Sequence, residues 1–288
     1  MRRPLPEVDK IEHRYIQGRS ITIHIAEAGH GDPVVMLHGW PQHWYMWRHQ
    51  ILTLAEHYRV ICPDLRGFGW SDAPKDGYEK EQMADDMVEL FDYLELQKVR
   101  LVGHDWGGWV GFLLCLRQPE RIHKYLALNI THPFQKLDFR HTALWRFWYQ
   151  FMIASPWLGL NILWNKSWFV RQLLVWGVVN KKWTEEEVQS YVSQFQEFSR
   201  AYASVQLYRT FLLREFTLIA RGFYLGQRLS VPTLLLFGDK DFAISTKLLK
   251  GYEAYADSMR IEHVHNCGHF IVDECPEIVT QQAIDFFK

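Results

Sequence analysis

Short apolar runs alternate with longer amphipathic patterns along the first 130 residues of the chain. Residues 20–25 alternate between apolar and polar side chains, which is typical of a half-exposed antiparallel strand. Residues 82–94 place apolar side chains at helical spacing and therefore predict a helix. Short, mostly apolar runs bounded by Gly, Pro or Asp occur at residues 34–37, 59–62, 99–102 and 126–128. Buried strands that alternate with amphipathic helices predict a mostly parallel sheet with helices on both of its faces.

The strand pattern stops near residue 132 and returns near residue 230. Residues 132–229 contain no strand pattern but seven of the thirteen tryptophans. Within them Thr184, with Glu187 three residues later, forms a capping box that predicts the start of a helix. The strand pattern then resumes at residues 231–238 and continues at residues 261–264. We therefore expect an α/β core in two parts with an all-helical cap inserted between them: residues 1–131, 230–288 and 132–229, respectively.

Residues 147–165 carry no charged side chain, a length at which a membrane span has to be considered. Pro156 and Gly159 interrupt this stretch, and a single span would place the two halves of one sheet on opposite sides of a bilayer. We therefore expect no membrane span but a helical cap that lines an apolar pocket. Adhesion of this segment to a membrane surface stays open.

The composition is that of a globular protein, with 48% apolar and 23% charged residues. The formal net charge of −1 provides no global basic field, so we expect no nucleic-acid partner. Four cysteines without a CxxC pair and an N-terminus without the apolar stretch of a secretory signal favour a cytoplasmic protein with reduced thiols. No metal-ligand spacing or phosphate-binding glycine loop occurs, so we expect neither a metal nor a cofactor. The sequence leaves open whether the chain forms a homodimer.

The strongest chemical signal is the sequence Gly103-His104-Asp105-Trp106-Gly107, between an apolar run and a helical pattern. A sharp strand-to-helix turn requires small residues two positions before and after its reactive side chain, as in the G-x-S-x-G nucleophile elbow of α/β-hydrolases. Here an aspartate takes the place of the serine. Because a carboxylate is ionised at pH 7, it can attack carbon without a base that removes a proton.

Two backbone N–H groups are candidates for an oxyanion hole, which such a hydrolase needs to stabilise a developing negative charge. One belongs to Trp106, the residue directly after the predicted nucleophile. The other belongs to Trp40, in a His-Gly-Trp-Pro sequence that follows the apolar run 34–37. We therefore predict that the N–H groups of both tryptophans point toward Asp105.

Two further polar residues follow the last two predicted strands. Asp241 comes after the run 231–238, and His269 comes after residues 261–264. The chain order of nucleophile, acid and histidine is that of α/β-hydrolases, and open α/β sheets place their active sites at the carboxyl ends of the strands. We predict that His269 acts as a general base on water, and that Asp241 orients its ring and stabilises the imidazolium.

With these motifs, the chain resembles the α/β-hydrolase-fold epoxide hydrolases over nearly its whole length, and is similar to the related haloalkane dehalogenases. The resemblance rests on residues 38–41, 44–50, 64–69, 103–107, 241–242 and 267–269. It implies a two-step reaction between a small apolar epoxide and water. Asp105 attacks an epoxide carbon to form a hydroxyalkyl-enzyme ester, and water activated by His269 and Asp241 hydrolyses this ester to a vicinal diol.

In the epoxide hydrolases two cap tyrosines hold and protonate the epoxide oxygen, because the ring opens only if the departing oxygen is stabilised. The resemblance assigns one of them to Tyr208. The expected position of the other holds Trp145, whose indole N–H can donate a hydrogen bond but not usefully a proton. Either Trp145 assists Tyr208, or Tyr149, four residues further on the same helix face, replaces the missing tyrosine. As further walls of the substrate pocket we expect Met46, Phe134, Trp148 and Trp157.

Two other functions stay open. Haloalkane dehalogenases share the aspartate and the tryptophan after it, and Trp106 with Trp145 or Trp40 can hold a departing halide. Those enzymes resemble H-G-N-P or H-G-E-P rather than the H-G-W-P sequence of this chain, and they have no use for a tyrosine such as Tyr208. A non-catalytic ligand-binding protein would tolerate the loss of nucleophile, acid or base, and the chain retains all three.

Overall fold

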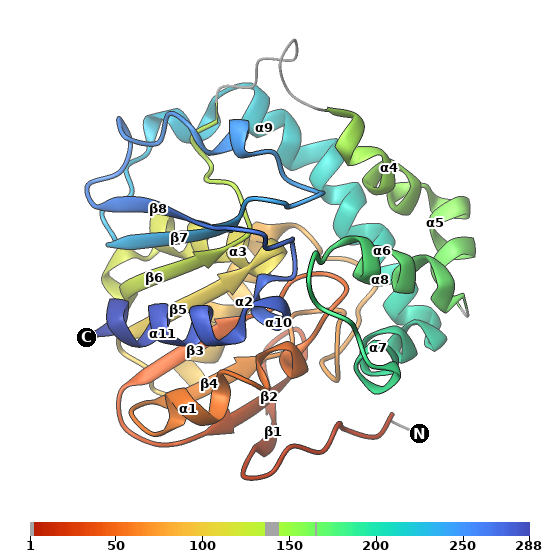
Figure 1. The fold of residues 1–288 in the computed structure, drawn as a ribbon, viewed down its shortest axis with the longest axis horizontal. Coiled ribbons are helices and arrows are strands. Elements are labelled where there is room, and N and C mark those ends of the chain that lie inside the picture. The colour runs from red at the N-terminus through yellow and green to blue at the C-terminus, as the bar shows by residue number, and fades with distance from the viewer. Residues whose placement is uncertain (1–2, 136–143, 165) are drawn as a thin grey trace.

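The computed structural model describes residues 3–135, 144–164 and 166–288. In this part of the chain an eight-stranded sheet has the strand order β1-β2-β4-β3-β5-β6-β7-β8 (Figure 1). The strands are β1 (Glu12–Gln17), β2 (Thr22–Ala28), β3 (Pro33–Leu37), β4 (Arg59–Pro63), β5 (Val99–His104), β6 (Ile122–Leu128), β7 (Thr233–Gly238) and β8 (Met259–Val264). β2 pairs antiparallel with β1 and β4, and the remaining neighbours are parallel.

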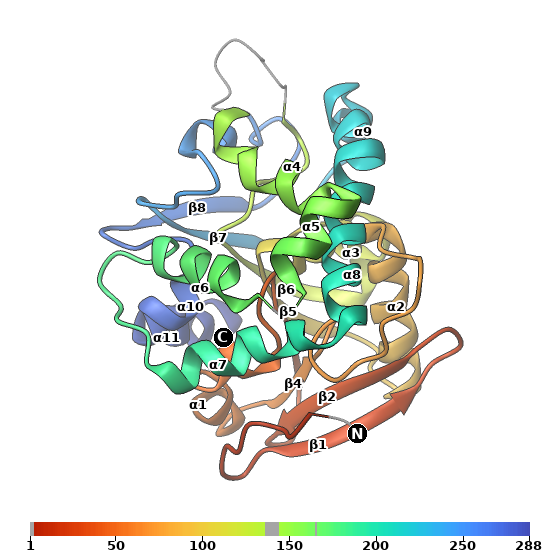
Figure 2. The ribbon, with the colours of Figure 1, turned by 90° about the vertical axis from the view of Figure 1, so that its right-hand side faces the viewer.

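Helices cover both faces of the sheet. Figures 1 and 2 show α1 and α11 on one face, and α2 and α3 on the other. The helices of the core are α1 (Ile51–Ala55), α2 (Lys80–Tyr93), α3 (Asp105–Arg117), α10 (Ile271–Glu274) and α11 (Pro276–Phe287). Because both faces are covered, the middle strands are apolar on both sides, and every residue of β7 is buried.

The predicted mostly parallel sheet is confirmed, and its apolar runs fall in β3, β4, β5, β6, β7 and β8. The predicted helix at residues 82–94 is α2. The sequence analysis missed β1, the edge strand. Ile16 is the only buried residue of β1, so this strand carries no apolar run from which it could be recognised.

The segment between β6 and β7 forms a helical cap, as predicted. Its helices are α4 (Trp148–Ala154), α5 (Pro156–Leu163), α6 (Ser167–Trp176), α7 (Glu185–Val192), α8 (Phe198–Thr210) and α9 (Phe216–Ala220). Thr184 caps α7, and the capping box with Glu187 is present. A π-helical turn, Phe211–Glu215, joins α8 to α9. Apart from a single β-bridge at Leu229, the described residues of this segment contain no strand.

The uncharged residues 147–164 do not form one long helix. They are divided between α4 and α5, with Ser155 and Pro156 at the junction. Across the described ranges, the structure contains no helix that is long and apolar enough to cross a membrane.

Gly107 lets the first turn of α3 pack directly on the backbone that follows β3. A Cβ atom at this position would lie 2.4 Å from the carbonyl oxygens of Leu37 and His38. We expect Gly107→Ala to lower the free energy of unfolding in urea by about 1–3 kcal/mol, the cost of overpacking a core. Gly226→Ala is the control, because no described atom lies within 4 Å of a Cβ atom there. An equal loss in both variants would contradict this packing.

Candidate active site

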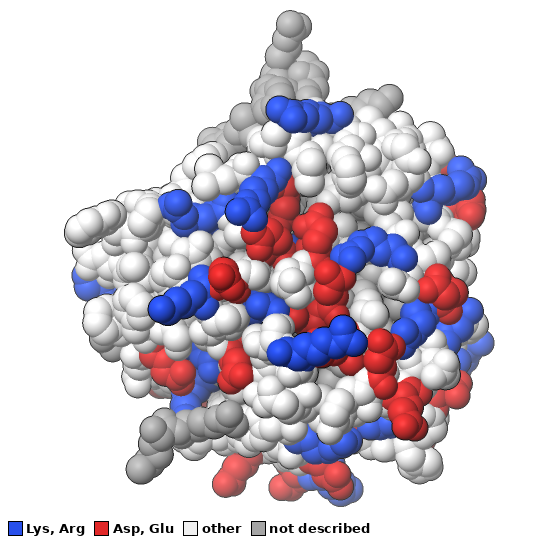
Figure 3. Space-filling view, turned by 180° about the vertical axis from the view of Figure 1, so that it is seen from behind, with Lys and Arg blue, Asp and Glu red and all other residues white. Residues whose placement is uncertain are grey.

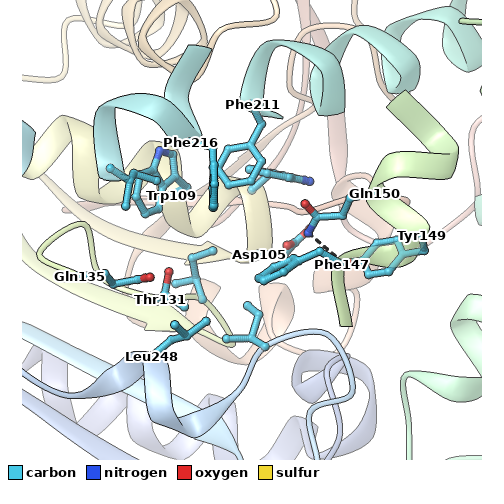
Figure 4. A pocket seen from close by; sticks show the side chains of 14 residues that line it. Asp105, Trp109, Thr131, Gln135, Phe147, Tyr149, Gln150, Phe211, Phe216 and Leu248 are labelled. Atoms are coloured by element: carbon cyan, nitrogen blue, oxygen red, sulfur yellow. Dashed lines mark hydrogen bonds between the residues drawn. The ribbon is translucent and has the colours of Figure 1, made fainter. Parts of the chain in front are cut away.

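Asp105 lies at the reversal of the chain between β5 and α3. Its backbone φ is +49°, in the left-handed region that side-chain-bearing residues rarely adopt. A Cβ atom on Gly103 would lie 2.5 Å from the carbonyl oxygen of Gly107. The two glycines therefore allow the reversal that the sequence predicted. The turn presents the Asp105 side chain to a pocket at the carboxyl end of the sheet (Figure 4).

The two oxygens of the Asp105 carboxylate have different surroundings. The N–H of Trp40 donates to Oδ2 over 3.0 Å, and the N–H of Trp106 also donates to the carboxylate. Oδ1 lies 3.9 Å from Nε2 of His269. Burial raises the pKa of Asp105 to about 6, although the His269 charge and the two N–H groups oppose this rise. The carboxylate is therefore mostly ionised at pH 7.

Asp241 and His269 follow β7 and β8, as predicted, and meet at the same edge of the sheet. Nδ1 of His269 lies 2.8 Å from Oδ2 of Asp241. Burial lowers the pKa of His269, but the Asp241 and Asp105 charges raise it by more, so it lies above its usual value. Burial likewise raises the pKa of Asp241, but His269 and further hydrogen bonds bring it below its usual value. His269 can therefore accept a proton on Nε2, the ring nitrogen that faces Asp105.

The sequence analysis missed the groups that hold Asp241. Nδ2 of Asn129 donates to Oδ2 of Asp241 over 2.8 Å. The N–H groups of Ala243 and Ile244 donate to Oδ1 over 2.7 and 3.0 Å. These bonds fix the carboxylate that orients the His269 ring. The one signal for Asn129 in the sequence was its place directly after an apolar run.

Tyr208 from α8 and Tyr149 from α4 meet over Asp105. Both side chains are buried, and their ring centroids are 6.1 Å apart. The edge of the Tyr208 ring also meets the rings of Trp40 and Trp106, at 5.5 and 5.4 Å. Burial raises the pKa of both tyrosines, and the Asp105 charge adds to this rise. Both hydroxyl groups therefore keep their protons at neutral pH and can donate hydrogen bonds.

A cavity of about 680 Å³, which includes the space at its open mouth, lies between Asp105 and the cap. Its apolar walls come from core and cap alike: Trp109, Ile130, Phe147, Phe211, Phe216 and Ile219. Gln150 lines the cavity beside Tyr149, and Figure 4 shows its Nε2 donating to the Tyr149 hydroxyl, over 3.4 Å. The buried Oε1 of Gln150 has no partner among the described residues. The cavity therefore suits an apolar molecule that carries a few polar groups.

Several predicted pocket residues lie elsewhere. Phe134 is buried but stacks on the Tyr255 ring at 5.2 Å, and Met46 lies inside the core. Trp148 is 40% exposed and Trp157 is 89% exposed, so both face solvent. None of these four predicted side chains lines the cavity at Asp105. Consecutive residues of a helix point about 100° apart, so α4 turns Trp148 outward where it turns Tyr149 inward. The side chain of Trp145 lies outside the described residues.

A buried ion pair, which no sequence pattern signalled, joins the cap to the core beside this site. Nζ of Lys80 lies 3.3 Å from Oε2 of Glu215 and donates to the carbonyl oxygen of Leu207 over 2.6 Å. The ammonium group also lies 4.7 Å from the Trp106 ring centroid. Lys80 thus binds the end of α8, next to Tyr208, to the core residue that follows Asp105.

The described part of the chain offers no arrangement of side chains suited to a metal ion. In the described ranges, no group of three or more His, Cys, Asp or Glu side chains is placed to hold a metal ion. The four cysteines are free.

Comparison with known proteins agrees with this geometry. The model of the α/β hydrolase fold family matches residues 32–276. The chain is 30% identical to a soluble epoxide hydrolase of Corynebacterium sp. (strain C12), over 96% of this chain and 98% of that protein. It is also 30% identical to epoxide hydrolase 4 of Mus musculus, over 95% of this chain and 78% of that protein.

Solved structures give the same result. The epoxide hydrolase CorEH superposes with a TM-score of 0.87 at 30% identity, covering 96% of this chain and 98% of its own. The epoxide hydrolase VrEH1 of Vigna radiata gives 0.83 at 27% identity, covering 98% and 99%. The chain therefore belongs to the α/β-hydrolase fold family. Within that family it is similar to epoxide hydrolases over nearly its full length.

Proposed function

We propose that the protein is an epoxide hydrolase that converts an apolar epoxide to a vicinal diol. The observation that carries this proposal is that a carboxylate, a His–Asp pair and two tyrosine hydroxyl groups lie at or beside one cavity. The ionised Asp105 carboxylate and the protonated Tyr149 both line the cavity. The His269–Asp241 pair lies next to the carboxylate, and the protonated Tyr208 packs against Tyr149. A nucleophile and an acid that face each other are what the opening of an epoxide requires. The similarity to epoxide hydrolases supports the same reaction.

In the first step, Oδ1 of Asp105 forms a bond to an epoxide carbon while the bond from that carbon to the ring oxygen breaks. The departing oxygen takes a proton from Tyr208, and Tyr149 donates a hydrogen bond to it. The product of this step is an ester between Asp105 and the hydroxyalkyl group. Tyr149 thus fills the place of the second tyrosine, at which the sequence holds Trp145.

In the second step, Nε2 of His269 removes a proton from water, and the hydroxide attacks Cγ of Asp105. Negative charge then develops on Oδ2, which accepts from the N–H of Trp40, while the N–H of Trp106 donates to the same carboxylate group. The tetrahedral intermediate releases the diol oxygen, which takes the proton back from His269. The carboxylic acid that remains returns its proton to the tyrosinate of Tyr208.

His269→Gln separates the two steps. We expect this variant to open the epoxide but not to hydrolyse the ester, so that intact-protein mass spectrometry with styrene oxide detects a protein heavier by one epoxide. Asp105→Asn is the matched control and is expected to form no adduct and to show no turnover. A His269→Gln enzyme that produces diol without an adduct would contradict the ester mechanism.

The two tyrosines supply the acid. Tyr208→Phe and Tyr149→Phe are each expected to slow the opening of styrene oxide by about tenfold or more, the low end for a positioned acid. Tyr202→Phe, on the same helix as Tyr208, serves as control and is expected to leave the rate unchanged. A parallel assay with 1-bromobutane follows bromide release. If Tyr208→Phe has no effect and bromide is released, the enzyme is a dehalogenase instead.

Ester formation requires the ionised form of Asp105. Since the pKa of this group is about 6, the single-turnover rate should rise with pH through about 6 and then level off. The pKa of both tyrosines lies above the usual value, so no decrease is expected below about pH 10. The measurement is the burst of ester formation across this range of pH. A rate that falls between pH 6 and 8 would rule out this assignment.

A further inference from the structure

Helices α4, α5 and α6 expose an unusual number of large aromatic side chains. The most exposed are Trp157 (89%), Phe151 (61%), Trp168 (59%), Trp176 (52%), Trp164 (44%) and Trp148 (40%). We call these six side chains the tryptophan face. Large exposed apolar patches mark interaction sites. None of the six lines the cavity at Asp105, so the chemistry proposed above does not explain them.

The tryptophan face spans neighbouring helices. Figure 2 shows α4, α5 and α6 together on the outer side of the cap, facing the viewer. The ring of Trp148 on α4 packs against that of Trp176 on α6, with centroids 6.4 Å apart. At the other end, Trp164 packs against Phe198 at 5.2 Å, so the face continues onto α8. Packing of this kind between exposed rings leaves a broad apolar surface rather than scattered single side chains.

The segment of the chain that carries the tryptophan face is rich in basic residues and contains no acidic ones, although α7 next to it begins with three glutamates. Residues 139–184 contain six Lys or Arg and no Asp or Glu, although 33 of the 288 residues are acidic. Arg171 pairs with Glu185 of the neighbouring α7, but Lys166 and Lys182 are exposed, and Lys166 stands two residues before Trp168 in the chain. On the back of the molecule, as seen from the view of Figure 1, acidic and basic side chains are interspersed (Figure 3). Residues 139–184, which include all six side chains of the tryptophan face, are therefore a basic segment without acidic residues of their own.

We propose that the tryptophan face adsorbs to the surface of an anionic lipid bilayer. Tryptophan is the side chain that prefers the boundary between lipid and water, because its ring is apolar and its N–H is polar. Basic residues beside such a face are attracted to anionic headgroups. A second copy of the chain fits less well, since a symmetric contact between two such faces would bring lysines of like charge together.

Adsorption would not disturb the cavity. α4 turns Trp148 and Phe151 outward and Tyr149 and Gln150 inward, so one short helix forms both the bilayer-facing surface and a cavity wall. The bilayer would then hold apolar molecules close to the cavity. The proposal itself rests on the outer surface alone and not on the reaction at Asp105.

The test is flotation of the full chain with vesicles. We expect binding to vesicles of phosphatidylglycerol and phosphatidylcholine, and weaker binding to vesicles of phosphatidylcholine alone. The double variant Trp157→Ser/Trp168→Ser is expected to reduce binding by about tenfold or more, since it removes two of the most exposed rings. Tyr93→Ser removes an exposed aromatic ring from the core helix α2, 58% exposed, and is expected to leave binding unchanged.

A second pair of variants covers the case in which the double tryptophan variant does not fold. Lys166→Glu/Lys182→Glu keeps every tryptophan and is expected to abolish the preference for anionic vesicles. Light scattering on the same samples measures the oligomeric state. The proposal is overturned if no vesicle is bound, if Tyr93→Ser weakens binding as much as the tryptophan variant, or if a dimer that Trp157→Ser dissociates forms without any binding to vesicles.

Discussion

The site depends on how closely the backbone at residues 37–40 approaches the turn at residues 105–107. A Cβ atom on Gly39 would lie 2.5 Å from the Cβ atom of Asp105, and one on Gly107 would lie 2.4 Å from the Leu37 carbonyl. Only because glycines stand at these places can the N–H of Trp40 reach the Asp105 carboxylate. The left-handed backbone of Asp105 is held by this packing. This close packing therefore both positions the side chain of the proposed nucleophile and brings an N–H group to its carboxylate.

Burial and hydrogen bonding oppose each other at this carboxylate. Burial disfavours the ionised form and raises the pKa of Asp105. Two N–H groups and the His269 charge offset part of this rise, so that the pKa is about 6. The neighbouring Asp241 is also buried, but its donors, Asn129 among them, hold its pKa below the usual value. The two carboxylates beside His269 therefore differ in pKa, which is raised at Asp105 and lowered at Asp241. Asp241 remains an orienting charge, whereas Asp105 keeps an oxygen free toward the cavity.

The cap completes the site from above and is bound to the core by polar contacts as well as apolar ones. Lys80 joins the end of α8 to Trp106, and a buried pair of this kind fixes geometry more than it adds stability. The cap helix α4 has a second surface, which faces away from the core and carries exposed Trp148 and Phe151. One insertion thus carries both the proposed acids and the proposed contact with lipid.

The sequence by itself determined the fold class, the helical insertion and the turn at Asp105, because apolar periodicity and glycine spacing are local consequences of backbone sterics. The order of Asp105, Asp241 and His269 after their strands also predicted that they meet, since parallel strands end at one edge. Only the tertiary structure placed the buried Tyr149 side chain beside the Tyr208 ring. It alone brought Asn129 and Lys80 to the site and turned Trp148 outward, because which face of a cap helix is buried depends on neighbours far away in the chain.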